Sequence, residues 1–125
     1  MHKTINTDKA PAAIGPYNQA ILSNNTLYMS GQIAINPENG ELVLDSIKSE
    51  THRVLQNMGE VLKEAGMNYQ NMVKCTIFMK SMDFYQEVNE VYAEYFKSNP
   101  PAREAVAVAG LPKNVNVEIS AIAVK

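Results

Sequence analysis

Two stretches of the chain repeat apolar residues at steps of three and four, and they limit the possible fold most strongly. The longer stretch runs from Ser46 to Ala65, and the shorter one follows Asp83. Such spacing places the apolar side chains on one stripe of a helix. Asp45 or Ser46 can cap the first helix, and Gly66 suits its end. The stripes consist of Ile47, Thr51, Val54, Leu55, Met58, Val61, Leu62 and Ala65, and of Phe84, Val88, Val91, Tyr92, Tyr95 and Phe96.

Strand patterns occupy much of the remaining chain. The second helix is expected to begin with a capping pair, Asp83 and Gln86, and to end before Asn99-Pro100-Pro101. Alternation within 73–80 is expected to place Val73, Cys75, Ile77 and Met79 on one face. The expected strands are 3–6, 20–23, 27–35, 73–80, 105–109 and 115–124.

Two helices with one apolar stripe each predict an α+β fold, in which a single sheet is covered by helices on one face. The other sheet face then needs a cover of its own. The last strand is apolar on both faces, with Val117 and Ile119 on one face and Ile122 and Val124 on the other. A second subunit is the simplest cover for a chain that forms one domain over 1–125, so we expect an oligomer.

Arg103 is the most informative polar residue. It lies in the expected strand 101–109, and its neighbours on the same face are Ala105, Ala107 and Ala109. Three alanines leave vacant space beside a guanidinium that cannot lose its charge. This pattern indicates a site for a small carboxylate, gripped by two parallel hydrogen bonds. The alternative is a surface arginine at the start of a strand.

Glu118 is the second candidate, because acids are depleted in strand interiors. It alternates with Asn116 and Ser120, so this face is either simply solvated or carries a general base whose pKa is raised by desolvation. Cys75 is read as a small core residue, and His52 as part of a solvated helix face.

Composition excludes several classes. The formal net charge is −2 and no run of like charges occurs, so neither a nucleic acid nor a membrane surface is an expected partner. No metal-ligand spacing occurs, and the single cysteine cannot form an intramolecular disulfide. With no secretory signal and no long apolar run, the expected location is cytoplasmic.

Several motifs resemble the RidA (YjgF) family in collinear order. The stretch 10–20, APAAIGPYNQA, is similar to its N-terminal signature, and Ser30-Gly31-Gln32 and Val73-Lys74-Cys75-Thr76 are similar to its middle. The C-terminal signature is matched by Pro101-Ala102-Arg103, Leu111-Pro112-Lys113 and Val117-Glu118-Ile119. The resemblance extends from about Lys3 to Val124, nearly the whole chain.

This resemblance implies a chorismate-mutase-like fold and a homotrimer with three clefts at subunit interfaces. It implies hydrolysis of reactive enamines and imines (2-aminoacrylate/2-iminopropanoate and 2-iminobutanoate) to 2-oxo acids and ammonia, without metal or cofactor. Pyridoxal-phosphate enzymes such as threonine dehydratase release these intermediates and are damaged by them.

The resemblance also implies roles for individual residues. Arg103 would grip the carboxylate, Glu118 would orient or deprotonate a water, and the Ala105 carbonyl would hold that water; many members have cysteine there. The other implied substrate-binding residues are Tyr17, Ser30, Gly31 and Asn89. Glu104 departs from the pattern of small residues and is expected to point away from Arg103.

Two other functions stay open. Some relatives are described as ribonucleases or translation inhibitors, against which the net charge of −2 argues. The chain could also be a non-catalytic binder of 2-oxo acids that acts as a regulator. Arg103 would suffice for a binder, whereas Glu118 adds a role that only a hydrolase needs.

Overall fold

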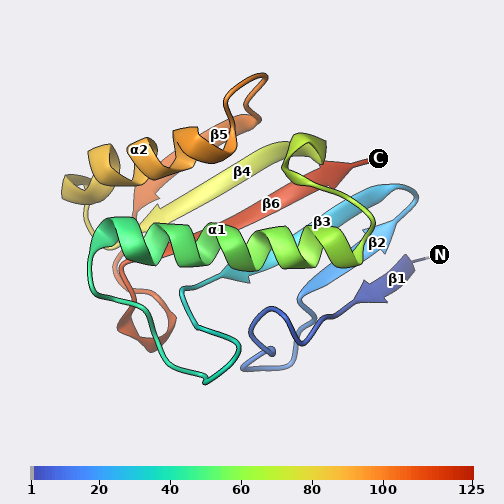
Figure 1. The fold of residues 1–125 in the computed structure, drawn as a ribbon, viewed down its shortest axis with the longest axis horizontal. Helices are drawn as coiled ribbons and strands as arrows, with labels where there is room; N and C mark the ends of the chain where they lie inside the picture. The colour runs from blue at the N-terminus through green and yellow to red at the C-terminus, as the bar shows by residue number, and fades with distance from the viewer. Residues whose placement is uncertain (1) are drawn as a thin grey trace.

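The computed structural model describes residues 2–125, so Met1 of the expected domain 1–125 lies outside the described residues. All six strands belong to one sheet, and two α-helices pack on it (Figure 1). The strands are β1 (His2–Ile5), β2 (Ala20–Ser23), β3 (Thr26–Gln32), β4 (Met72–Met79), β5 (Ala102–Ala107) and β6 (Val117–Val124), and the helices are α1 (Ile47–Glu64) and α2 (Tyr85–Tyr95). The predicted α+β fold, with a mixed sheet and both helices on one face, is confirmed.

The sheet order is β1-β2-β3-β6-β4-β5, which the sequence left open. The last strand, β6, lies between β3 and β4 and pairs antiparallel with both. β5 pairs only with β4, in parallel, and is therefore an edge strand. This order places the two candidate residues, Arg103 on β5 and Glu118 on β6, two strands apart.

Helix α1 forms as its pattern predicts. The Ser46 side chain accepts a hydrogen bond from the Ser49 N–H at 3.0 Å, and Gly66 follows the helix with φ +73°. The apolar stripe of α1 is buried against the inner face of the sheet from Thr51 to Ala65, and Ile47 at its start is partly buried. Each such side chain contributes roughly 2 kcal/mol by leaving water. The core joins Val54, Leu55, Met58, Val61 and Leu62 of α1 to Leu27, Cys75, Ile77 and Ile119 of the sheet.

Three local predictions are wrong. β3 ends at Gln32 rather than at residue 35, because the chain turns there: the Ile35 N–H donates to the Ile33 carbonyl at 2.9 Å instead of pairing with β6. Val73 is 48% exposed, since a register shift between Met72 and Lys74 gives the buried position to Met72.

The predicted capping pair at Asp83 is also wrong. The Ser81 side chain accepts from the Asp83 N–H at 3.0 Å and caps a short 3-10 turn, Met82–Phe84. Helix α2 continues directly from that turn and has no side-chain cap of its own.

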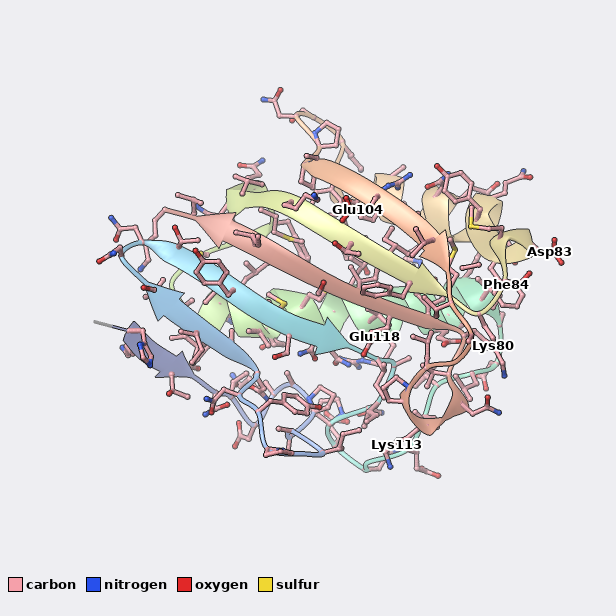
Figure 2. All side chains as sticks on the ribbon, turned by 180° about the vertical axis from the view of Figure 1, so that it is seen from behind. Lys80, Asp83, Phe84, Glu104, Lys113 and Glu118 are labelled. Carbon is pink, nitrogen blue, oxygen red and sulfur yellow. The ribbon has the colours of Figure 1, made fainter. Side chains whose placement is uncertain are left out.

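The face of the sheet away from the helices is partly apolar (Figure 2). Tyr28 and Val106 are 51% and 41% exposed; Tyr28 lies between buried Leu27 and Met29, and Val106 follows Ala105, which packs on the core. Val124 at the end of β6 is 40% exposed on the same face. This surface, which we call the open face, is the one that the sequence analysis expected a second subunit to cover.

Candidate active site

Arg103 projects from β5 toward helix α2. Its Nη2 donates a hydrogen bond to the Tyr85 hydroxyl at 3.0 Å, and its Cζ lies 4.9 Å from the centroid of the Tyr92 ring. Aromatic faces attract a guanidinium and limit its motion. Within residues 2–125 no carboxylate forms an ion pair with Arg103. The guanidinium is thus held in place by neutral groups and keeps donors for an anion.

A cleft of about 400 Å³ opens beside Arg103. Asn89 of α2 and Phe96 directly after it line one side, and Pro100 and Pro101 line it from the loop before β5. The vacant space that the sequence assigned to neighbouring alanines is therefore shaped mainly by α2. The structure brings the predicted residue Asn89 next to Arg103.

Ala105 presents its backbone to the free edge of the sheet. The Val108 N–H donates to the Met79 carbonyl of β4 at 2.9 Å, and the backbone groups of alternate residues on a strand point to opposite sides. Because Val108 faces β4, residue 106 does so too, and the Ala105 carbonyl points away from β4. It is available to a water or to another chain.

Glu118 lies on the open face, because its neighbours Val117 and Ile119 are fully buried beneath the helices. Figure 2 shows it on the same face as Glu104. The carboxyl group is half-buried, and burial raises the pKa of Glu118 above its usual range. The side chain lies across Gly31: a Cβ added there would be 2.7 Å from the Glu118 carboxyl carbon. Position 31 therefore needs glycine to admit this carboxylate.

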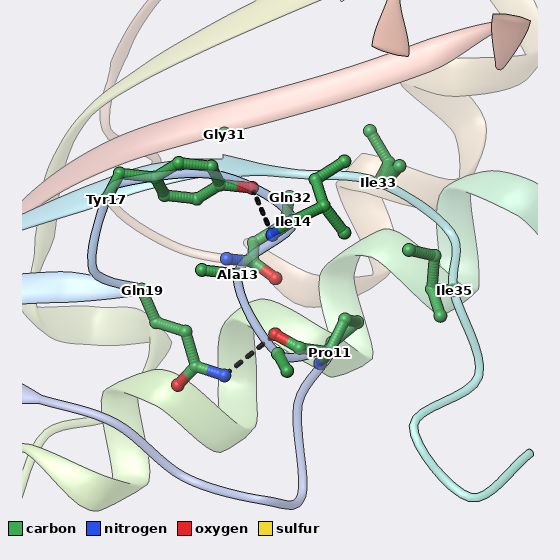
Figure 3. A pocket seen from close by; sticks show the side chains of 10 residues that line it. Pro11, Ala13, Ile14, Tyr17, Gln19, Gly31, Gln32, Ile33 and Ile35 are labelled. Carbon is green, nitrogen blue, oxygen red and sulfur yellow. Dashed lines mark hydrogen bonds between the residues drawn. The ribbon is translucent and has the colours of Figure 1, made fainter. Parts of the chain in front are cut away.

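Tyr17 and Ser30 lie near Glu118 and Gly31. The Ser30 hydroxyl donates to the Asn18 carbonyl at 2.7 Å, which ties the end of β3 to the Tyr17 loop. Tyr17 and Gly31 line one hollow, and the Tyr17 hydroxyl accepts from the Ile14 N–H at 3.3 Å (Figure 3).

Buried Gln19 anchors this loop. Its side-chain amide donates to the Pro11 carbonyl at 2.8 Å (Figure 3). The same amide donates to the Thr7 carbonyl at 3.0 Å, and the side-chain oxygen of Gln19 accepts from the Thr7 N–H. These hydrogen bonds to the buried Gln19 side chain fix the loop that carries Tyr17.

The predicted site residues fall into two groups on opposite faces of the sheet. The arginine group, on the helix side and free edge of β5, contains Arg103, Ala105 and Asn89. The glutamate group, on the open face, contains Glu118, Gly31, Ser30 and Tyr17. Because the sheet separates the two groups, a small molecule cannot contact both within one chain.

Glu104 points away from Arg103, as predicted. It pairs with Lys74 at 3.0 Å and accepts from the Thr76 hydroxyl at 2.7 Å, and these hydrogen bonds, first that of Thr76, lower the pKa of Glu104. Cys75 is fully buried and burial raises the pKa of its thiol, which agrees with a core residue. His52 is not simply solvated, because its Nδ1 lies 2.9 Å from the Tyr95 hydroxyl.

The sequence analysis missed two residues of the arginine group, Tyr85 and Tyr92. Tyr92 was counted only as part of the apolar stripe, and Tyr85 was not counted at all. Both follow from the spacing around Asn89: residues four before and three after it lie on the same helix face.

The geometry defines a class of protein: a small α+β domain with an arginine beside a cleft on one face of its sheet and a half-buried glutamate on the other. Within residues 2–125 no three histidine, cysteine, aspartate or glutamate side chains gather as a metal site would require. Neither helix in the described chain has the length and apolarity to cross a membrane.

The model of the Endoribonuclease L-PSP family matches residues 7–125. The chain therefore belongs to this family, whose members are also called RidA or YjgF proteins. The predicted membership is confirmed.

Individual relatives are similar over the full chain. Human 2-iminobutanoate/2-iminopropanoate deaminase is 47% identical over 125 residues, 100% of this chain and 91% of the human one. The structure of a candidate endoribonuclease from Thermotoga maritima has a TM-score of 0.98 at 53% identity, covering 100% of this chain and 98% of the other. The YjgF gene product of E. coli has a TM-score of 0.94 at 40% identity, with 98% of each chain covered.

Proposed function

We propose that the protein hydrolyses reactive enamines and imines of small 2-amino acids to 2-oxo acids and ammonia. The substrates are 2-aminoacrylate/2-iminopropanoate and 2-iminobutanoate. The proposal depends on the pairing of two groups. The Arg103 guanidinium, which has no acidic partner within residues 2–125, lies beside a cleft, and the Glu118 carboxylate, whose pKa is raised by burial, lies on the opposite face of the sheet. The name and 47% identity of the human deaminase support the same reaction.

Hydrolysis of the imine needs a group that binds the substrate carboxylate, a water molecule that attacks the imine carbon, and a general base. Arg103 holds the substrate carboxylate through two parallel hydrogen bonds. Glu118 and the Ala105 carbonyl orient a water, and Glu118 takes its proton as the oxygen bonds to the imine carbon. The C=N π electrons move to nitrogen. Glu118 then returns the proton to that nitrogen, which gives a carbinolamine. In the second stage Glu118 takes the proton of the new hydroxyl group and passes it to the amino nitrogen as the C–N bond breaks, so a carbonyl and ammonia remain.

Tyr17, Ser30 and Gly31 complete the glutamate side of the site. Gly31 leaves room for the Glu118 carboxylate, as its close approach requires. Tyr17 lines the same hollow as Gly31, and Ser30 precedes Gly31 in β3. Neither a metal nor a cofactor takes part in these steps.

A second copy of the chain must complete each site, because the arginine and glutamate groups lie on opposite faces. Contact between two different surfaces can close into a ring, and three copies give a trimer with three equivalent sites. The open face, with Tyr28, Val106 and Val124 exposed, supplies apolar area for this contact.

Mixing two inactive variants tests this assembly. We expect Arg103→Ala and Glu118→Gln subunits, unfolded and refolded together in equal amounts, to recover activity in roughly a quarter of the sites, where an intact arginine meets an intact glutamate across an interface. The measurement is imine hydrolysis by the refolded mixture, with light scattering for its mass. Each variant refolded alone is the control. A mixture as inactive as its parts, or a monomeric mass for the wild type, would refute the shared site.

The proposed reaction is tested by generating 2-aminoacrylate with a serine dehydratase and following pyruvate release. Added wild-type protein should accelerate the appearance of pyruvate beyond spontaneous hydrolysis. An unchanged rate, together with tight binding of a 2-oxo acid, would favour the metabolite-binding regulator instead.

The proposal places the protein beside pyridoxal-phosphate dehydratases in the cytoplasm, since these enzymes release its substrates. The endoribonuclease name of the family suggests RNA as another substrate. Glu118 in the site and the net charge of −2 oppose binding of a polyanion, so we favour the deaminase.

A further inference from the structure

Tyr85 is the exposed neighbour of the proposed substrate grip. It is the first residue of α2, and its side chain is 37% exposed. Its hydroxyl oxygen accepts the hydrogen bond from Arg103 Nη2 at 3.0 Å, and the Arg103 Cζ lies 5.7 Å from the centre of its ring. The hydroxyl thus lies next to the N–H groups of the guanidinium that remain for a bound carboxylate.

Counting donors and acceptors shows what this hydroxyl can still do. A tyrosine hydroxyl accepts through its lone pairs and donates one proton. Arg103 is the donor to this hydroxyl, and a hydrogen bond with Asn89, followed by the charge of Arg103, lowers the pKa of Tyr85. A guanidinium has no acceptor, so Arg103 cannot take the Tyr85 proton, and this proton stays available to an acceptor that binds beside Arg103.

We propose that Tyr85 is a substrate-binding residue, whose hydroxyl donates a hydrogen bond to the carboxylate that Arg103 holds. This inference rests on the proposed function, and it specifies how the site recognises its substrate class. An ionised 2-imino or 2-oxo acid offers acceptors to the guanidinium fork and to the hydroxyl together. A carboxamide of the same size places a donor where one acceptor is needed, and leaves a polar group unpaired.

The same geometry assigns a separate role to Tyr92. Tyr92 lines the cleft but is only 5% exposed, and its hydroxyl is buried. Tyr92 therefore supports the guanidinium through its ring, whereas Tyr85 offers a hydroxyl to the ligand. Removing only the hydroxyl of Tyr85 keeps its ring beside Arg103.

The test compares Tyr85→Phe with Tyr95→Phe. Tyr95 lies on the same helix, and its hydroxyl contacts His52 rather than Arg103. Calorimetry with 2-oxobutanoate, a stable product, measures carboxylate binding, and 2-oxobutanamide serves as the uncharged probe. We expect Tyr85→Phe to bind 2-oxobutanoate about ten-fold more weakly, the scale of one lost hydrogen bond to a charged group. Tyr95→Phe should bind it as the wild type does, and Tyr85→Phe should not weaken binding of the amide.

Each other outcome decides the question. Equal or tighter binding of 2-oxobutanoate by Tyr85→Phe would overturn the inference, because the hydroxyl would then be a spectator or a competitor for Arg103. Equal weakening for acid and amide would make Tyr85 a packing residue. If the wild type binds 2-oxobutanoate without hydrolysing imines, only the proposed reaction fails. If it binds no 2-oxobutanoate, both proposals fail.

Discussion

Arg103→Ala is expected to remove nearly all imine hydrolysis while the protein stays folded. A two-fold hydrogen bond between guanidinium and carboxylate in a desolvated cleft contributes about 3 kcal/mol or more, which is over a hundredfold in rate. The loss should appear in kcat/KM from the coupled dehydratase assay. Circular dichroism and thermal melting should match the wild type, because Arg103 lies on an edge strand and no charged partner within residues 2–125 is left behind.

Arg103→Lys should be nearly as inactive as the alanine variant. An ammonium group cannot form the planar fork, and it loses the stacking on Tyr92. Arg53→Lys is the matched control: Arg53 binds the Asn57 side chain on α1, outside both groups of the site, so its activity should stay within a few-fold of the wild type. An Arg103→Lys variant with near wild-type kcat/KM would rule out the bidentate grip.

The helices could be predicted from the sequence because their signal is local. The apolar period of α1 and the flanking Ser46 and Gly66 lie within one continuous stretch. The strand order could not be predicted, because β6 enters between β3 and β4 from the far end of the chain. No local pattern of β6 distinguishes these partners from β5.

The local errors share a physical cause. Strict alternation predicted that Val73 points inward, but one extra residue at a bulge reverses the faces before Lys74. Ser81, two residues before the expected capping residue, satisfies the first N–H group instead. Bulges and short 3-10 turns depend on pairing and packing that a sequence pattern does not contain.

The candidate site was predictable residue by residue, but not as an arrangement. A charged residue in an alanine-rich strand and an acid in a strand interior both stand out by their chemistry. That Arg103 and Glu118 lie on opposite faces depends on how β5 and β6 fit into one sheet, which is non-local. Apolar periodicity does not reveal Tyr85, because its part in the site depends on its hydroxyl.

Glu118→Gln is expected to separate binding from catalysis. The variant keeps the size of the side chain but cannot take a proton from water. Its imine hydrolysis should fall by roughly a hundredfold or more, the usual scale for a lost general base. Its affinity for 2-oxobutanoate should stay near that of the wild type, because Arg103 supplies the grip. Calorimetry and the coupled assay on the same preparation measure both quantities.

Stability as a function of pH gives an independent check on Glu118. Burial raises its pKa in the folded chain, so the folded state binds this proton more tightly than the unfolded state does. The carboxylate therefore lowers stability as the pH rises through the raised pKa. At pH 7 Glu118→Gln should melt at a higher temperature than the wild type, and the difference should vanish in acid, where the carboxyl is protonated in both states.

Glu104→Gln is the matched control, because Glu104 lies on the same open face but has a lowered pKa. Its carboxylate stabilises the fold above the unfolded pKa and loses that effect as the pH falls through the folded one. The control should therefore melt slightly below the wild type at pH 7 and hydrolyse imines within a few-fold of its rate.

A Glu118→Gln variant that keeps full activity would leave the water to the Ala105 carbonyl alone. One that no longer binds 2-oxobutanoate would make Glu118 part of the binding site rather than its base.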